Sequence, residues 1–267
     1  MNYRLTKAIR NVVTLFFPPQ CPFCGRVTES RFDGALCEDC RASFIEDYIS
    51  VCPKCNSKSE FCRCAPDVKG EEWDHSPYTE ISPLIFDGYY TGYDENSIVS
   101  NLVFRMKRKR NSGAKALFAR MIAQRLSREL TLHGITPSDF TLTFIPRSET
   151  SRKEHDFDHM HTVAKRVAEM LGCSFSSLLI RKGGTVQKTL SASERAINAQ
   201  NSIFIHPRKK KIISGAKLIV IDDVITTGST MRTAVSKLSF AGADVIIPAA
   251  AMISVTNKKR PPIDGQK

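Results

Sequence analysis

The 267-residue sequence predicts an α/β domain built on a parallel sheet and preceded by a small cysteine-rich module. Two observations carry this prediction. Nearly all the cysteines fall between Cys21 and Cys64, and beyond residue 83 apolar runs of strand length alternate with segments of helical spacing. The runs at 216–221 and 245–253 are apolar throughout, which is typical of parallel strands that helices cover on both faces.

These runs predict the elements in chain order. Residues 1–66 are expected to form an N-terminal helix, over 5–17, and the cysteine module. The polar, proline-spaced segment 67–83 is expected to be a linker, 84–255 the α/β domain, and 256–267 a flexible tail. Strands are expected at 84–90, 141–145, 202–205, 216–221 and 245–253, and helices at 96–108, 114–130, 157–171 and 231–241.

The chain is strongly basic, with 39 Lys and Arg against 27 Asp and Glu and a formal net charge of +12. This excess favours polyanionic partners, namely nucleic acid, an anionic membrane or phosphorylated small molecules; a basic surface with no such partner is the alternative. No apolar run approaches the roughly 18 residues that span a bilayer. The N-terminal apolar stretch lacks a signal-peptide cleavage site. We therefore expect a cytoplasmic protein that is not membrane-spanning, whose clustered thiols stay reduced and bind metal.

The clustered cysteines form four close pairs, which is a zinc-binding pattern. Two residues between cysteines allow a tight turn to aim both sulfurs at one ion, and four thiolates complete a tetrahedral zinc shell. One or two structural Zn²⁺ ions are therefore predicted, and the module either only folds the N-terminus or also presents a surface to nucleic acid or protein. The expected ligands are Cys21, Cys24, Cys37 and Cys40 for one site and Cys52, Cys55, Cys62 and Cys64 for the other, with an interleaved pairing as the alternative.

The strongest functional signal follows the apolar run at 216–221. The strand is expected to end in Asp222 and Asp223, and a hydroxyl- and glycine-rich loop then leads into a helix. Backbone N–H groups at a helix N-terminus bind anions, and Gly228 lets the backbone approach a phosphate closely. The sequence is neither a Walker loop nor a Gly-x-Gly-x-x-Gly turn. The alternative interpretation is an ordinary strand–turn–helix junction that Thr226 or Thr227 caps.

This junction resembles the phosphoribosyl pyrophosphate loop of type I phosphoribosyltransferases. The resemblance implies a type I phosphoribosyltransferase-like parallel sheet flanked by helices, and a ligand that is phosphoribosyl pyrophosphate or a related ribose phosphate, bound with Mg²⁺. It gives Asp222 and Asp223 the ribose hydroxyls. Substrate-binding roles in and around the loop then fall to Val224, Thr226, Thr227, Gly228, Ser229 and Thr230.

Taken with the four cysteine pairs, the whole chain resembles the ComF/GntX family, in which a zinc finger precedes a phosphoribosyltransferase-like domain. That resemblance implies a role in natural competence and DNA uptake. Single-stranded DNA and proteins of the competence machinery are then the expected partners. It also implies phosphoribosyltransferase activity, toward an acceptor that no motif in the sequence identifies.

Two further stretches resemble parts of the same family. Residues 144–148 resemble the strand and loop that contact pyrophosphate, and Lys153 follows in a stretch that is commonly basic in the family. The resemblance implies that Arg147 and Lys153 neutralise the leaving group. The family's Gly-Phe-Asn-Gln is replaced here by Asp-Phe-Asp-His at 156–159, which is a departure on the pyrophosphate side. Residues 187–195 resemble the hood over the site, from which Gln187, Ser191 and Arg195 would face the substrate.

Two weaker patterns leave alternatives open. His155, His159 and His161 are close enough to suggest a metal site, or simply a polar helix start. The basic run 105–110 could contact a nucleic-acid backbone or form a solvated helix end. Three hypotheses follow: a phosphoribosyltransferase-like enzyme, a nucleic-acid-binding factor that uses the phosphoribosyl site for a ligand, and a protein-interaction adaptor with a vestigial site.

Overall fold

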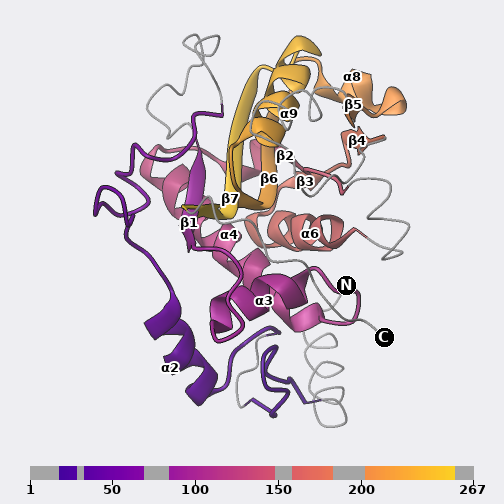
Figure 1. The fold of residues 1–267 in the computed structure, drawn as a ribbon. Coiled ribbons are helices and arrows are strands. Elements are labelled where there is room, and N and C mark those ends of the chain that lie inside the picture. The colour runs from indigo at the N-terminus through magenta and orange to yellow at the C-terminus, as the bar shows by residue number, and fades with distance from the viewer. Residues whose placement is uncertain (1–17, 29–32, 69–83, 148–157, 183–201, 256–267) are drawn as a thin grey trace.

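A five-stranded parallel sheet forms the centre of the computed structural model, which describes residues 18–28, 33–68, 84–147, 158–182 and 202–255. The strand order is β1-β7-β6-β2-β3, and every pairing in this sheet is parallel. Figure 1 shows β6 and β7 side by side at its centre. The bounds are β1 Ile85–Tyr90, β2 Phe140–Phe144, β3 Ser174–Phe175, β6 Lys217–Ile225 and β7 Val245–Ser254.

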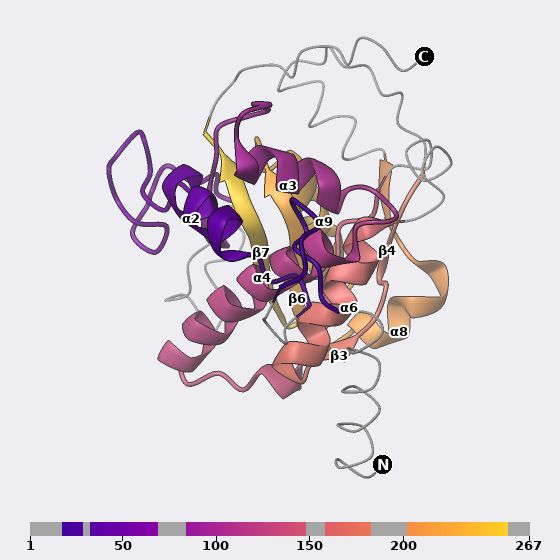
Figure 2. The same ribbon diagram turned by 90° about the horizontal axis from the view of Figure 1, so that it is seen from below.

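Helices cover both faces of this sheet (Figures 1 and 2). One face carries α3 (Ile98–Met106), α4 (Ser112–Leu132) and α6 (His159–Leu171), and α9 (Ser229–Phe240) lies on the other. Each face has its own cluster of buried apolar side chains. Every residue of β7 except the last is buried, which explains why its sequence is apolar without alternation.

Local signals explain where the helices begin and end. Ser97 and Asn111 cap α3 and α4, because their side chains accept hydrogen bonds from backbone N–H groups of the first turn. Asp158 does the same for α6 by accepting from the backbone N–H of Met160 at 3.0 Å. The α6 helix ends at Gly172, which adopts the left-handed conformation (φ +71°) that stops many helices.

The predicted α/β class with a parallel sheet is confirmed, and each predicted strand and helix beyond residue 83 is present within a few residues of its expected bounds. The strand expected at 202–205 corrects the prediction in one respect. It is β5 (Ile203–Ile205), and it pairs antiparallel with β4 (Leu179–Arg181) in a separate two-stranded sheet. The helix expected at 5–17 and the tail lie outside the described residues.

Several short elements were not predicted. β3 and β4 have two and three residues, too few to show a period, and α2 (Glu38–Asp47) buries only Cys40, so it has no apolar stripe. The basic segment 208–211 is helical. The remaining short helices are η2 Pro137–Asp139, η3 Pro207–Lys209 and α8 Lys210–Ile213.

The cysteine module packs directly on the α/β domain. Tyr48 donates a hydrogen bond to Asp87 of β1, and Ile49 forms an antiparallel bridge with Tyr89. Asp47 accepts from the Ser97 hydroxyl at 2.6 Å and so joins α2 to the start of α3. Cysteines of the module also belong to the hydrophobic clusters on both faces of the sheet.

No helix among the described residues is long and apolar enough to cross a membrane.

Candidate functional site

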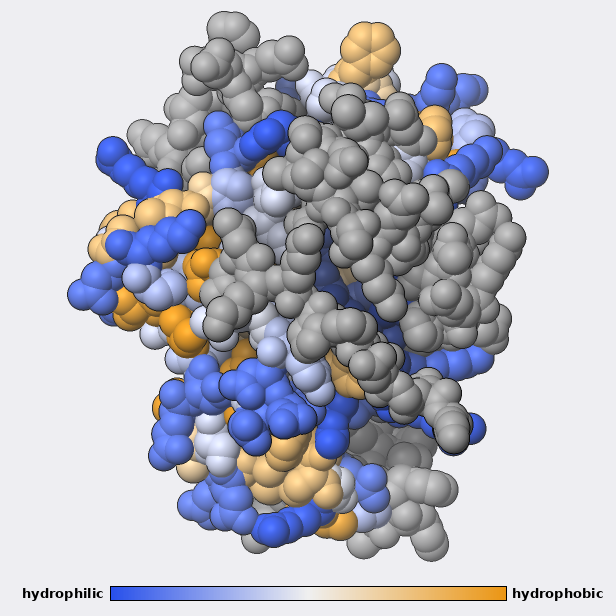
Figure 3. All heavy atoms as spheres, in the orientation of Figure 1, coloured by the Kyte–Doolittle hydropathy of each residue, from blue (hydrophilic) through white to orange (hydrophobic). Residues whose placement is uncertain are grey.

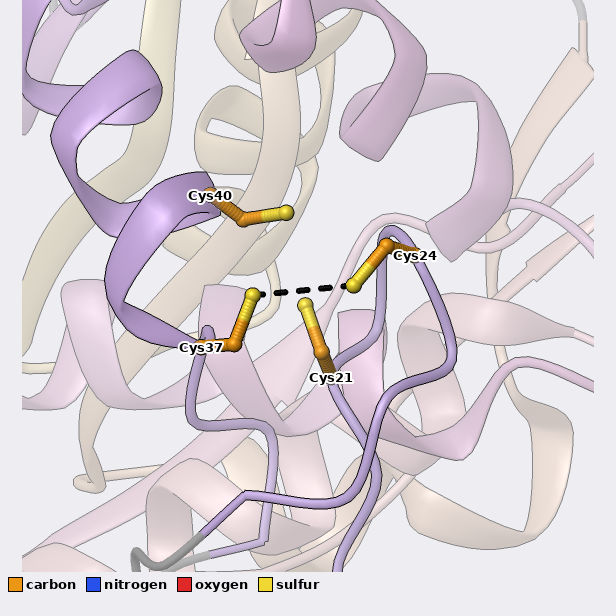
Figure 4. A group of neighbouring side chains, drawn as sticks. All are labelled: Cys21, Cys24, Cys37 and Cys40. Carbon is orange, nitrogen blue, oxygen red and sulfur yellow. Dashed lines mark hydrogen bonds between the residues drawn. The ribbon is translucent and has the colours of Figure 1, made fainter.

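Four cysteines of the module converge on one point. In Figure 4, Cys21 and Cys24 approach from a turn, and Cys37 and Cys40 approach from the start of α2. Their sulfurs all lie within 4.8 Å of one another, and the Sγ atoms of Cys24 and Cys37 are 3.6 Å apart. Tetrahedral zinc with Zn–S bonds near 2.3 Å places sulfurs about 3.8 Å apart. The group therefore fits a structural zinc ion.

A second group has the same geometry. Cys52, Cys55, Cys62 and Cys64 also keep their sulfurs within 4.8 Å, with the Sγ atoms of Cys55 and Cys62 at 3.7 Å. The structure thus brings the eight cysteines together in sequential rather than interleaved groups. We call the segment 20–40 ribbon one and the segment 51–64 ribbon two. Cys173 joins neither group and packs against the hydrophobic core.

Hydrogen bonds prepare individual thiols to act as ligands. Burial opposes ionisation of Cys21, but backbone N–H groups of Cys24 and Cys37 lower its pKa to about 7. The backbone of Ser57 lowers the pKa of Cys55 to about 6. Its partner Cys64 has a pKa raised to about 12, mainly because its side chain bonds to Cys55. Four thiolates together therefore require a bound cation to offset their mutual repulsion.

The acid pair, Asp222 and Asp223, lies at the carboxyl end of the central strand. β6 stays paired with β7 as far as Ile225, whereas its pairing with β2 ends where Phe144 meets Ile221. The acid pair therefore follows the point where β2 turns away, at the edge where open α/β sheets bind ligands. The strand extends beyond the expected apolar run 216–221, because it includes the acid pair and continues to Ile225.

Asp223 is buried and sits among cations. Its Oδ2 lies 2.8 Å from Nζ of Lys107 and 3.1 Å from Nε2 of His159. Burial alone would raise the pKa of Asp223, but Lys107 and then His159 hold it well below the usual range. Burial lowers the pKa of His159, and the Nδ1 atom of the His159 ring has no hydrogen-bond partner among the described residues. Asp223 is therefore a carboxylate held in place by Lys107 and a neutral imidazole.

The pKa of Asp222 is shifted in the direction opposite to that of Asp223. It is half-buried, and its Oδ1 accepts a hydrogen bond from the backbone N–H of Asp223 at 2.8 Å. Burial and the neighbouring Asp223 charge raise the pKa of Asp222 well above its usual value, although Lys107 and Arg181 act against this. The pair thus combines one carboxylate already neutralised by cations and one that gains from a hydroxyl or cation ligand.

The phosphate loop, residues 226–230, connects β6 to α9. Gly228 is buried, has φ +76° and occupies the N-cap position of α9, which no side chain caps. The alternative interpretation, in which Thr226 or Thr227 is the N-cap residue, is therefore wrong, although Thr227 Oγ1 accepts a long hydrogen bond from the backbone N–H of Ser229 at 3.5 Å. Instead Thr227 Oγ1 and Ser229 Oγ lie 2.9 Å apart. Backbone N–H groups of the first turn and these two hydroxyls form a donor set suited to an anion.

The remaining predicted site residues divide into described and undescribed ones. Arg147 follows β2, donates from Nη2 to the backbone carbonyl of Lys107 at 3.0 Å, and has a pKa lowered by burial. Val224 packs partly against the core below the site, and Thr230 lies in the first turn of α9. Lys153, Gln187, Ser191 and Arg195 lie outside the described residues.

The histidine metal site is not supported where the structure describes it. His159 faces Asp223, whereas His161 makes edge contacts with Phe144 and Phe175, so these two rings do not converge. His155 lies outside the described residues. Among the described residues, the groups of three or more metal-ligating side chains that could hold an ion are the two cysteine groups.

The basic run 105–110 has more than one role. Arg105 donates to the backbone carbonyl of Phe23 in ribbon one, and Lys107 reaches Asp223. Arg108 is exposed and lies over the ring of Phe104. Neither alternative drawn from the sequence, a solvated helix end or a nucleic-acid contact, described the first two of these side chains.

Sequence reasoning missed three residues near the acid pair, namely Lys107, His159 and Arg181. A signal was present only for His159, which stands where the resembled family has Gln at the end of its Gly-Phe-Asn-Gln stretch. Lys107 is one of five basic residues in the run 105–110, and no feature of the sequence distinguishes it from the other four. Arg181 lies at the end of β4, a strand too short to recognise, and donates to the Ser202 hydroxyl at 3.3 Å.

Comparison with protein families agrees with this architecture. Residues 161–265 match the model of the phosphoribosyl transferase domain, and residues 12–69 match that of the double zinc ribbon domain. The chain has a type I phosphoribosyltransferase-like fold behind a cysteine-rich zinc ribbon. The phosphoribosyl transferase match includes the acid pair and the phosphate loop, and the double zinc ribbon match includes all eight clustered cysteines.

Similar proteins fall into two groups. DNA utilization protein YhgH of Salmonella typhimurium is 25% identical over 239 residues, covering 87% of this chain and 96% of that protein. Adenine phosphoribosyltransferase of Treponema denticola is 39% identical over 70 residues, covering 26% of this chain and 36% of the enzyme. The solved adenine phosphoribosyl transferase of Trypanosoma brucei has a TM-score of 0.34 and 14% identity, covering 62% of this chain and 75% of that one.

Proposed function

We propose that this protein binds the ribose 5-phosphate group of phosphoribosyl pyrophosphate, together with Mg²⁺, at the junction of β6 and α9. The observation that supports this most directly is the placement of two carboxylates and an uncapped helix N-terminus on one strand–loop–helix unit. A sugar phosphate needs both: hydrogen-bond acceptors for its hydroxyls and N–H donors for its phosphate. The match of residues 161–265 to the phosphoribosyl transferase domain supports the same ligand class.

In this proposal each part of the junction has one task. The acid pair accepts hydrogen bonds from the ribose hydroxyls, and the phosphate loop surrounds the 5′-phosphate. Carboxylate oxygens suit Mg²⁺, but both oxygens of Asp223 already accept contacts from Lys107, His159 and the Val224 backbone. Mg²⁺ would therefore be held mainly by the ligand's own oxygens, with Asp222 as the protein group that fits it.

We further propose the reaction class of a phosphoribosyltransferase. The bond between ribose C1 and the pyrophosphate oxygen would break with its electron pair leaving on pyrophosphate, and an acceptor nucleophile would form the new bond at C1. In this proposal Arg147 and Lys153 would neutralise the charge of the leaving group. The protein's contribution to such a reaction is mainly positioning and charge neutralisation.

Calorimetric titration with phosphoribosyl pyrophosphate and Mg²⁺ tests this proposal. We expect the parent to bind and Asp222→Asn to bind about ten- to a hundredfold more weakly, because charge-assisted hydrogen bonds contribute about 1.5–3 kcal/mol. Asp222 is the better target, since Asp223 also holds Lys107 and His159. Asp244→Asn is the matched control, because Asp244 is exposed next to the opposite end of β7. Equal affinity of parent and Asp222→Asn, or no binding by either, would contradict the proposal.

A second function is proposed on a separate observation. The Salmonella typhimurium relative is a DNA utilization protein, and this chain carries a net charge of +12. We propose that the protein acts in the cytoplasm during natural competence, as the ComF/GntX resemblance implies, where it handles single-stranded DNA beside proteins of the DNA-uptake machinery. On the face that Figure 3 shows, blue hydrophilic side chains cover much of the surface that is not grey.

The salt dependence of the affinity for single-stranded DNA tests this second function. We expect the affinity for single-stranded DNA to fall steeply with salt, and Arg108→Gln/Arg110→Gln to reduce the slope of log K against log salt by about 0.7 for each lost phosphate contact. Both arginines are exposed beyond the end of α3. Lys165→Gln, an exposed cation on α6, should leave the slope unchanged. Binding that does not respond to salt would rule this function out.

A further inference from the structure

The segment directly after ribbon two packs against the phosphate loop. A Cβ placed on Gly228 would lie 3.0 Å from Cβ of Pro66 and 3.0 Å from Cγ1 of Val68. Val68 is completely buried, although it belongs to the segment 67–83, whose composition indicates a linker. The loop and this segment therefore pack closely at the glycine of the phosphate site, which leaves no room there for a side chain.

A hydrogen bond fixes the same contact from the other side. Arg232 belongs to the first turn of α9, since its backbone N–H bonds to the Gly228 carbonyl at 2.8 Å. Its guanidinium donates to the backbone carbonyl of Asp67, from Nε at 3.1 Å and also from Nη2. Asp67 and Arg232 are 165 residues apart in the sequence. This long-range contact orients the start of α9 relative to ribbon two.

The segment is also tied to the second cysteine group. Cys64 stands two residues before Pro66, and Cys52 is fully buried in the hydrophobic cluster that contains Val68 and Met231. Met231 follows the phosphate loop in α9. Loss of the ion from ribbon two would free the cysteines that hold this segment, and the segment would then no longer support the loop.

We propose that ribbon two positions the phosphate loop, so that zinc binding at Cys52, Cys55, Cys62 and Cys64 and ligand binding at the loop are energetically coupled. Asp67, Val68 and Arg232 are the positioning residues. The coupling deepens the proposed function and rests on it, since it concerns the same ligand site. Coupling between two equilibria is reciprocal: zinc tightens ligand binding, and the ligand by the same factor tightens zinc binding.

Equilibrium competition for zinc with a chromogenic chelator tests the coupling, with and without phosphoribosyl pyrophosphate and Mg²⁺. We expect the parent to lose two ions to the chelator, and the ligand to raise the zinc affinity of one site about fivefold or more, a typical size for coupling between sites. Arg232→Gln should abolish this gain in zinc affinity and weaken ligand binding by a similar factor, while still binding two zinc ions. Val68→Ala, which removes packing instead of the hydrogen bond, should act in the same direction.

Arg128→Gln is the matched control. Arg128 pairs with Glu60 of ribbon two at 2.8 Å but lies on α4, so its loss removes an arginine contact to ribbon two while leaving the phosphate loop untouched. This variant should keep the parent's ligand effect. An equal gain in affinity at both zinc sites would indicate general stabilisation and overturn the coupling, as would an unchanged gain in Arg232→Gln. If the parent itself binds no phosphoribosyl pyrophosphate, the proposed function fails first; if it binds with no change in zinc affinity, only the coupling fails.

Discussion

Removal of both zinc ions is expected to unfold the two cysteine groups and α2, and to lower the melting temperature of the α/β domain in the same transition. Structural zinc contributes about 10–16 kcal/mol of apparent binding free energy in small zinc modules, which is comparable to the stability of a domain. Cys21 and Cys40 belong to the hydrophobic cluster under α3, α4 and α6, and Cys52 belongs to the cluster under α9. Loss of the ions therefore opens both faces of the sheet.

Circular dichroism during a thermal ramp measures this, before and after treatment with a strong chelator and again after zinc is restored. Elemental analysis should find two zinc ions per chain in the parent. It should find two also in Cys173→Ser, because Cys173 lies outside both cysteine groups. A domain that keeps its melting temperature while the ribbons alone melt would show that the shared core contributes little.

Much of the fold could be predicted because the relevant signals are local in sequence. The buried runs of β6 and β7 and the spacing of the cysteine pairs each lie within a dozen residues. The acid pair and Gly228 were predictable for the same reason, since one continuous segment supplies carboxylates, hydroxyls and a glycine with positive φ. Local patterns of this kind specify element type and turn chemistry directly.

The electrostatics of the site could not be predicted, because they depend on contacts between distant segments. Lys107 reaches Asp223 only after α3 has packed beside the sheet, and His159 reaches it 64 residues away in sequence. No feature of the five basic residues in the sequence distinguishes Lys107, which enters the site, from the others, which do not. The contact of Val68 with Gly228 was hidden in the same way, behind a segment whose composition indicates a linker.

Asp223→Asn and Asp222→Asn are expected to change stability in opposite directions at neutral pH. Asp223→Asn removes the buried partner of Lys107 and His159, and breaking a buried ion pair costs about 3–5 kcal/mol. We expect the lower end, because the Lys107 side chain is 36% exposed and can turn to water. Asp222→Asn removes a carboxylate whose ionised form burial and Asp223 disfavour, so a gain of about 1 kcal/mol is expected beside the loss of ligand binding.

Denaturant unfolding at neutral and acidic pH separates the two effects by sign. The pKa of Asp223 is lowered on folding, so its stabilising contribution is present at neutral pH and is lost only as the pH falls through that low value. The pKa of Asp222 is raised, so its ionisation costs stability as the pH rises through the folded-state value, and the advantage of Asp222→Asn should disappear in acid. Asp244→Asn is the matched control for removal of one carboxylate, since Asp244 is exposed and lies away from the acid pair. A loss of stability in Asp222→Asn at neutral pH would contradict this arrangement of charges, whereas a gain would mean that the protein retains an unfavourable carboxylate where a ligand is expected to bind.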